Sequence, residues 1–164
     1  MHIFSRVAEW NAKRYDRQFN FKLTKELLQE ELKEFQDSRT KVESVDALCD
    51  LAFVAIGGLW KLGTTEDSVL NILQHVLDRE EQLPAFKELV DNLHEEPDIK
   101  LMCIVVKAFN MIEDKGVNAF RAFNAVCDSN DSKEIVKLAP NEKYDSSGKG
   151  PNYFEPKLEE IVNA

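Results

Sequence analysis

Residues 41–63 read KVESVDALCDLAFVAIGGLWKLG, and this stretch decides the fold class. After Val45 it is apolar on nearly every side of a helix, and Gly63 ends the pattern. A helix that is apolar almost all round lies at the centre of a bundle. Gly57 and Gly58 inside it predict close approach to a neighbouring helix rather than a phosphate-binding loop. The stretch therefore predicts a buried central helix.

Apolar residues recur at helical spacing along most of the chain, and no alternation with a period of two extends beyond a few residues. The predicted class is therefore all-α. Thr24 is the expected N-cap of the second helix. We expect one domain over 1–164, with a helical core over about 1–128 and an irregular C-terminal strap over about 129–164. The expected helices cover residues 2–14, 24–37, 40–62, 65–79, 84–94, 98–115, 117–128 and 156–162.

The composition excludes several classes of function. The 164 residues include 30 acidic and 21 basic side chains, for a net charge of −9, which disfavours binding to nucleic acid. No stretch approaches the roughly 20 apolar residues that a membrane span needs. Three cysteines without C-x-x-C spacing argue against a disulfide scaffold or a cysteine zinc site. Because the start also lacks a signal-peptide pattern, we expect a cytoplasmic protein without membrane or nucleic-acid partners.

Two groups of carboxylates carry the chemistry. Three share one side of the helix expected at 24–37: Glu30, Glu31 and Glu34. Three more share a face of the central helix: Glu43, Asp46 and Asp50. Asp46 and Asp50 have mostly apolar neighbours, where a carboxylate is costly unless it is paired or bound to metal. A short turn near residues 38–40 would make the two helices antiparallel and bring both acidic faces into one groove.

Mutual repulsion makes such a groove unfavourable until a hard divalent cation binds it. Oxygen ligands without histidine or cysteine favour Mg²⁺ or Mn²⁺ over zinc or copper. Since metals bridge carboxylates to phosphates, the groove predicts an enzyme that acts on a phosphorylated substrate. The alternative is a solvated acidic face on a non-enzymatic helical protein that binds a basic partner.

The acidic motifs resemble those of the all-α nucleoside triphosphate pyrophosphohydrolases, which include MazG proteins, dimeric dUTPases and phosphoribosyl-ATP pyrophosphohydrolases. EELKE at 30–34 matches the first motif, E-E-x-x-E, in full. The second motif, E-x-x-D, can be aligned in two ways. Glu43 and Asp46 fit it directly. If Asp50 is instead its aspartate, the glutamate position falls on Ala47, and Asp46, one residue earlier, is the substitute. VDALCDLAFVAIG resembles the phage-type form D-A-L-x-D-L-x-Y-V-x-x-G, with Phe53 in place of tyrosine, and favours Asp46 and Asp50.

A second resemblance to the phage-type members lies in the C-terminal region. AFNAVCDSNDSK at 122–133 resembles A-F-x-x-V-x-x-S-N-x-S-K, with Cys127 where histidine is common. GKGPNYFEPKLEEI at 148–161 resembles the closing K-G-P-N-Y-x-x-P segment. Residues 64–115 match nothing in this pattern.

The resemblance implies a MazG-like helical bundle that hydrolyses a (deoxy)nucleoside triphosphate between its α- and β-phosphates. The products would be a (deoxy)nucleoside monophosphate and pyrophosphate, and the reaction would depend on Mg²⁺ or Mn²⁺. A narrower dUTP- or dCTP-type house-cleaning pyrophosphatase is the alternative within this class. The resemblance also implies a homo-oligomer, either dimer or tetramer, located in the host cytoplasm if the protein is phage-encoded.

Residue roles follow from the matched motifs. The implied metal ligands are Glu31, Glu34, Asp46 and Asp50. Glu30 is the implied catalytic residue, which ligates metal or orients the attacking water, and Glu43 is a candidate outer ligand. The residues implied to hold phosphate or base are Asn130, Lys133 and Lys149, with Tyr153 stacking on base or sugar.

Overall fold

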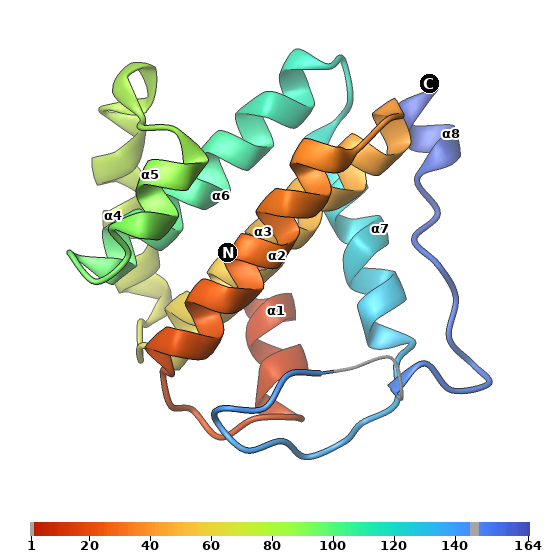
Figure 1. Ribbon diagram of the computed structural model, residues 1–164, viewed down its shortest axis with the longest axis horizontal. Coiled ribbons are helices and arrows are strands. Elements are labelled where there is room, and N and C mark those ends of the chain that lie inside the picture. The colour runs from red at the N-terminus through yellow and green to blue at the C-terminus, as the bar shows by residue number, and fades with distance from the viewer. Residues whose placement is uncertain (1, 145–147) are drawn as a thin grey trace.

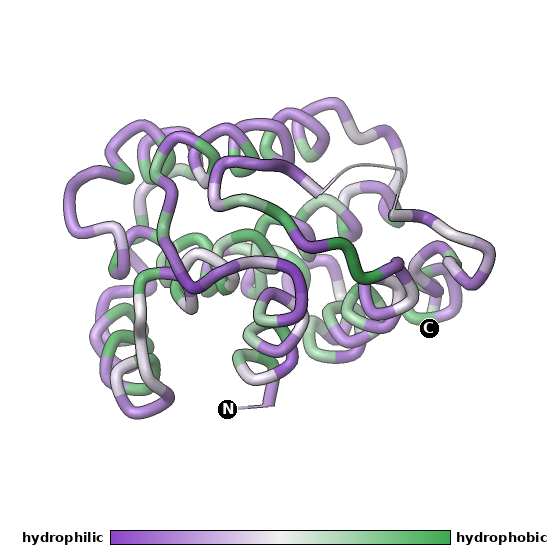
Figure 2. Tube along the Cα trace, turned by 90° about the horizontal axis from the view of Figure 1, so that it is seen from below, coloured by the Kyte–Doolittle hydropathy of each residue, from purple (hydrophilic) through white to green (hydrophobic). Residues whose placement is uncertain are grey.

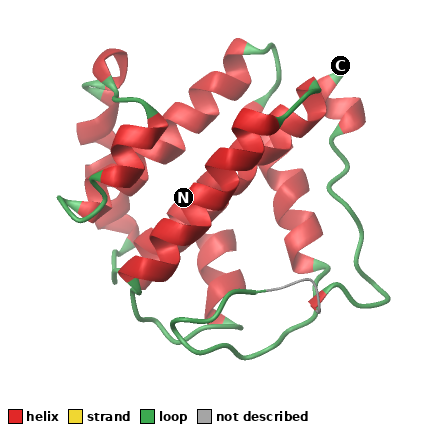
Figure 3. Cartoon of the chain, in the orientation of Figure 1, coloured by secondary structure: helices red, strands yellow, loops and turns green. Residues whose placement is uncertain are grey.

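The computed structural model describes residues 2–144 and 148–164, which form eight α-helices and no strand (Figures 1 and 3). The all-α prediction is confirmed. The helices are α1 (His2–Ala12), α2 (Phe21–Asp37), α3 (Lys41–Lys61), α4 (Glu66–Leu77), α5 (Phe86–Asp91), α6 (Pro97–Asp114), α7 (Ala119–Asp131) and α8 (Glu159–Val162), with a 3₁₀ turn η1 (Glu80–Gln82) before α5. Within the described ranges, no helix combines the length and the apolar character needed to cross a membrane.

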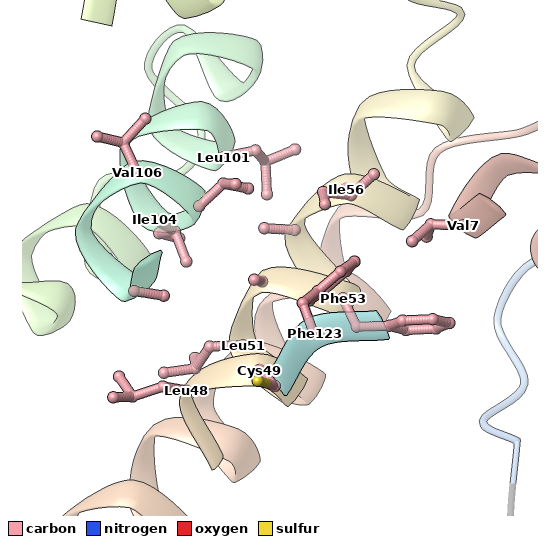
Figure 4. Close-up of a cluster of buried hydrophobic side chains, with 14 of the residues drawn as sticks. Val7, Leu48, Cys49, Leu51, Phe53, Ile56, Leu101, Ile104, Val106 and Phe123 are labelled. Carbon is pink, nitrogen blue, oxygen red and sulfur yellow. The ribbon is translucent and has the colours of Figure 1, made fainter. Parts of the chain in front are cut away.

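Helix α3 is the centre of the bundle, as its apolar sequence predicts. It packs most extensively against α6 and α2 and also contacts α1, α7 and α8 (Figure 1). Figure 4 shows Leu48 and Leu51 of α3 pointing to the side where α6 presents Leu101 and Ile104. All four leucine and isoleucine side chains are fully buried. The neighbours of α3 therefore fix its position on several sides.

The two glycines of α3 allow neighbouring helices to approach closely. A Cβ atom at Gly58 would lie 2.9 Å from Leu101 Cδ1 of α6. A Cβ atom at Gly57 would lie 3.0 Å from Asn11 Nδ2 of α1. Both distances are shorter than ordinary carbon contacts, so a side chain at either position would require the buried Leu101 or Asn11 side chain to shift. The predicted close helix approach is confirmed.

Most helix starts follow the expected capping chemistry, with one correction. Thr40 and Thr65 cap α3 and α4 through their side-chain oxygens, as their sequence positions indicate. The N-cap of α2 is Asn20 and not Thr24, because Asn20 Oδ1 accepts a hydrogen bond of 2.8 Å from Leu23 N. Asparagine is the stronger N-cap, so the helix begins at Phe21, and Thr24 is buried inside its first turns.

The C-terminal strap begins as helix, because α7 continues to Asp131, and residues 145–147 of the strap are outside the described ranges. After α7 the chain crosses to the α1–α2 loop, returns, and rises beside α7 to α8 (Figure 1). Figure 2 views the molecule from the side on which the strap crosses the helices. Leu138 N donates a hydrogen bond of 2.7 Å to Arg14 O. The buried Arg14 guanidinium stacks on Trp10 at 4.2 Å and donates to Lys133 O at 3.0 Å, which anchors the strap to α1.

Candidate metal centre

The antiparallel pairing of α2 and α3 brings carboxylates from both helices together. Glu31 and Glu34 of α2 and Asp50 of α3 each offer an oxygen, and these three oxygens lie within 4.8 Å of one another. Asp46 lies one turn before Asp50 on α3, and its charge acts to raise the pKa of both Glu31 and Asp50. We call these four residues the carboxylate cluster. The spacing of the acids in the sequence predicted this meeting of two helix faces.

Burial and mutual repulsion favour protonation of this cluster. Burial, followed by the charges of Glu34, Asp46 and Glu30, raises the pKa of Glu31 to about 8. Burial, followed by the charges of Asp46 and Glu31, raises the pKa of Asp50 well above its ordinary value. Without a compensating cation, the ionised cluster is unfavourable.

Two buried oxygens in the cluster have no hydrogen-bond donor among the described residues: Glu31 Oε2 and Asp46 Oδ1. Buried polar atoms in native proteins are nearly always paired, so each of these oxygens needs a partner. Oxygen ligands crowded within 4.8 Å suit a hard divalent cation such as Mg²⁺ or Mn²⁺. The residues present therefore fit the implied metal.

Glu155 of the strap adds an acid that the sequence motifs did not single out. Burial and then the charge of Glu155 are the main causes that raise the pKa of Asp46 to about 6. In the family pattern Glu155 falls on a variable position of K-G-P-N-Y-x-x-P, so the motif gave no signal for it. Only the folded structure reveals the role of Glu155, because it brings the strap close to Asp46 in the N-terminal half of α3.

The two other candidate acids lie at the rim. Glu30 is half exposed and forms an ion pair with Lys143 of the strap. Glu43 is exposed, and its Oε2 accepts a hydrogen bond of 2.8 Å from Arg39 N at the start of α3. Together with the Thr40 cap, this contact gives Glu43 a helix-capping role. Glu43 is therefore accounted for without a metal, whereas Asp46 has an orphaned oxygen.

The strap supplies a cation, Lys133, whose charge acts on the cluster. Lys133 Nζ donates a hydrogen bond of 2.9 Å to Asn130 Oδ1. Burial lowers the pKa of Lys133, and its charge in turn acts to lower the pKa of Glu31, Asp46 and Asp50. Asn130 itself is buried, and its backbone oxygen accepts a hydrogen bond of 2.9 Å from Trp10 Nε1. Lys133 and Asn130 are thus held beside the carboxylates.

The remaining predicted substrate contacts lie farther out on the strap. Lys149 is exposed, and its Nζ lies 5.0 Å from the centre of the Tyr153 ring. The positive charge of Lys149 also acts to lower the pKa of Asp46, so this lysine stabilises the ionised form of that carboxylate. The structure thus places Lys149 and Tyr153 together, close enough to the cluster for the lysine charge to act on Asp46.

A cavity of about 180 Å³ opens from the cluster between α1, α2, α3 and the strap, and we call it the central cavity. Glu31, Asp50, Asn130 and Lys133 line its acidic end. Aromatic and polar residues that the motifs did not predict line the rest, among them Trp10, Asn11, Tyr15, Lys61 and Tyr144. Lys61 follows Asp50 by eleven positions, close to three whole helical turns, so a helical projection of α3 would have placed both on one face.

The helical fold and the grouped carboxylates define an all-α protein with a cluster of acids on two adjacent helices. Residues 2–76 match the family model of phosphoribosyl-ATP pyrophosphohydrolase. This match contains both acidic helices and confirms, for this part of the chain, the resemblance to the MazG-like all-α pyrophosphohydrolases. It supports nucleotide pyrophosphohydrolase activity in general terms. No curated protein and no solved structure matches the chain.

The metal-free protein is expected to lose stability as pH rises from about 4 to 8. The pKa of Glu31 rises from 4.5 to about 8 on folding and that of Asp46 from 3.8 to about 6, so the folded state holds more protons in this range. Stability must then fall with pH. Because one unit of pKa shift corresponds to about 1.4 kcal/mol, we expect a loss of at least about 2 kcal/mol, or roughly 5 °C or more in Tm, in thermal unfolding with chelator present. Glu31→Gln should flatten this dependence and the exposed control Glu160→Gln should not; a flat wild-type profile would contradict the prediction.

Proposed function

We propose that this protein hydrolyses a (deoxy)nucleoside triphosphate between the α- and β-phosphates, with Mg²⁺ or Mn²⁺, to give the monophosphate and pyrophosphate. The observation that carries the proposal is the close set of three carboxylate oxygens from Glu31, Glu34 and Asp50. They lie on two antiparallel helices inside the segment that matches a pyrophosphohydrolase family. Acids grouped this closely, with Glu31 and Asp50 half-buried, Glu34 exposed and a lysine beside them, suit a metal and an anionic substrate together.

The carboxylate cluster would hold the metal, with Asp46 as the fourth ligand beside the three grouped oxygens. Asp46 Oδ1 and Glu31 Oε2 are buried oxygens of the cluster that accept no hydrogen bond from the described residues. A divalent cation bound there would neutralise phosphate charge and lower the pKa of a bound water. The chain contributes the ligand set, its burial and its fixed geometry on two helices.

Residues at the rim would bind and orient the substrate. Lys133 and Asn130 lie at the acidic end of the central cavity, where an ammonium and an amide can hold phosphate oxygens. Lys149 and Tyr153 would close over the substrate from the strap. Glu30 would orient the attacking water or accept its proton, and the ion pair between Glu30 and Lys143 must open for it to do so.

Pyrophosphate release is the direct test of this proposal. The purified protein is assayed against a panel of ribo- and deoxynucleoside triphosphates with Mg²⁺ or Mn²⁺. We expect pyrophosphate and a monophosphate as the first products from at least one of them, and complete loss of activity with excess chelator. Orthophosphate as the sole first product would rule out cleavage between the α- and β-phosphates.

We also propose that the chain works as a cytoplasmic homo-oligomer, a dimer or a tetramer. The support is an apolar groove of about 500 Å³ between α1, α3, α4, α6 and α7. Leu70, Leu77 and Phe120 at this groove are 50%, 38% and 57% exposed, which is unusual for large apolar side chains gathered on one surface. A second copy would cover these side chains, most simply through two-fold symmetry.

Phe120→Glu is expected to dissociate this oligomer, because a charge placed in an apolar interface is desolvated without a partner. Light scattering coupled to gel filtration should give the monomer mass for the variant and an oligomer mass for the wild type. Ile135→Glu is the matched control, because Ile135 is 61% exposed on the strap and lies outside the groove. A wild-type monomer at micromolar concentration with full activity would contradict the proposal.

A further inference from the structure

The central cavity continues from the carboxylate cluster along the paired helices. The register of α2 and α3 gives its direction, since Glu31 groups with Asp50, and Thr24 lies 3.5 Å from a Cβ built at Gly58. Lys61 follows three residues after Gly58 and lines the same cavity. The eleven residues from Asp50 to Lys61 advance about 16 Å along a helix. A triphosphate held at the acidic end would therefore direct its nucleoside toward Lys61.

The walls of this far end suit a flat ring. Gly57 and Gly58 line the cavity on the α3 side together with Phe53 and Val54, and Tyr15 and Trp10 contribute aromatic surface. Lys61 Nζ lies 3.8 Å from the centre of the Tyr15 ring. The lysine is thus held by the aromatic wall at the end of the cavity.

Two polar atoms at this end, Lys61 Nζ and Asn11 Oδ1, form no hydrogen bond with the described residues. Lys61 forms no ion pair or hydrogen bond with any described residue, and burial lowers its pKa to about 8. Asn11 is buried, and its Nδ2 donates a hydrogen bond of 2.9 Å to Val7 O. Its Oδ1 accepts no hydrogen bond from the described part of the chain and lies beside Gly57. The cavity therefore ends in a donor-only ammonium and an amide acceptor.

We infer that Lys61 and Asn11 select a base with a carbonyl oxygen next to a ring N–H, the edge presented by uracil, thymine and guanine. This inference rests on the proposed function, whose substrate class it narrows. The ammonium would donate to the carbonyl oxygen, and Asn11 Oδ1 would accept from the ring N–H. Cytosine and adenine carry an amino group and an unprotonated ring nitrogen at that edge. Their amino group would face the ammonium, and the amide oxygen would be left without a donor.

The test compares kcat/KM for pyrophosphate release from dUTP, dTTP and dGTP with that from dCTP and dATP. The wild type should favour dUTP over dCTP by at least about 10-fold. Lys61→Met should remove most of this ratio while preserving the melting temperature. Lys22→Met, an exposed lysine of α2 that does not line the cavity, is the matched control and should keep the ratio.

A binding measurement separates this inference from the proposed reaction. Deoxyuridine and deoxycytidine, which carry no phosphate, are titrated into the metal-free protein by NMR. Deoxyuridine should bind more tightly to the wild type, and Lys61→Met should abolish the difference. Equal binding of the two nucleosides, or a preference that survives Lys61→Met, overturns the base assignment. Absence of pyrophosphate release from every nucleotide overturns the proposed reaction, and the nucleoside titration still decides the role of Lys61.

Discussion

Asp50→Asn is expected to abolish turnover and to leave the metal-free protein at least as stable as the wild type. Burial and the charges of Asp46 and Glu31 raise the pKa of Asp50, so its ionised form destabilises the metal-free fold. The amide has nearly the same volume and removes both the desolvation and the repulsion. A purely structural aspartate would show the opposite result, because its loss would leave hydrogen-bond donors unpaired.

Addition of metal should make the wild type more stable than Asp50→Asn, which reverses the order expected for the metal-free proteins. A ligand that binds only the folded state stabilises it by about 2.7 kcal/mol at one hundred times its Kd. For a chain of this length that corresponds to roughly 5–10 °C in Tm. The wild type should gain this shift on addition of Mn²⁺, and Asp50→Asn should gain clearly less, because an amide oxygen is a weaker ligand for a hard cation.

The measurement is thermal unfolding of both proteins with chelator and with Mn²⁺, beside the pyrophosphate assay. Turnover should fall by roughly 10³-fold or more. Asp91→Asn is the matched control, since Asp91 lies in α5 and pairs with Lys87 away from the cluster. Strong destabilisation of metal-free Asp50→Asn, or turnover near that of the wild type, would make Asp50 a structural residue.

The parts of the site predicted from sequence are those that depend on spacing within a helix. Glu31 and Glu34 are three residues apart, and Asp46 and Asp50 are four apart, so each pair shares a helix face. The short turn after α2 then leaves few ways to arrange the two helices. Local periodicity and one tight connection were therefore sufficient to predict the meeting of Glu31, Glu34 and Asp50.

The site residues that the sequence patterns did not predict are those that depend on contacts between distant segments of the chain. Glu155 influences Asp46 from more than one hundred residues away, and Lys143 reaches Glu30 from the strap. No periodicity links such pairs, because irregular chain can approach a helix at any register. The cap of α2 was misplaced for a local reason, since Asn20 and Thr24 are both cap-forming residues and the apolar pattern does not choose between them.

Gly58→Val is expected to destabilise the protein by about 2 kcal/mol and to lower Tm by several degrees. The first added carbon would lie 2.9 Å from Leu101 Cδ1, and Leu101 is fully buried on α6. Valine has the better helix propensity, but that gain is only about 0.5 kcal/mol and is smaller than the strain of overpacking. Turnover should fall as well, because a shift of α3 moves Asp50 relative to Glu31.

A second substitution distinguishes overpacking from other causes of this loss. Leu101→Ala alone should cost about 2–5 kcal/mol, because it leaves a cavity between α3 and α6. In the double variant Gly58→Val with Leu101→Ala, the valine fills part of that cavity. The double variant should therefore lose about 1 kcal/mol less stability than the sum of the losses of the two single variants. Urea unfolding of the four proteins measures this coupling. Strict additivity would show that Gly58 does not set the distance between α3 and α6, and the close approach of these helices would then need another cause.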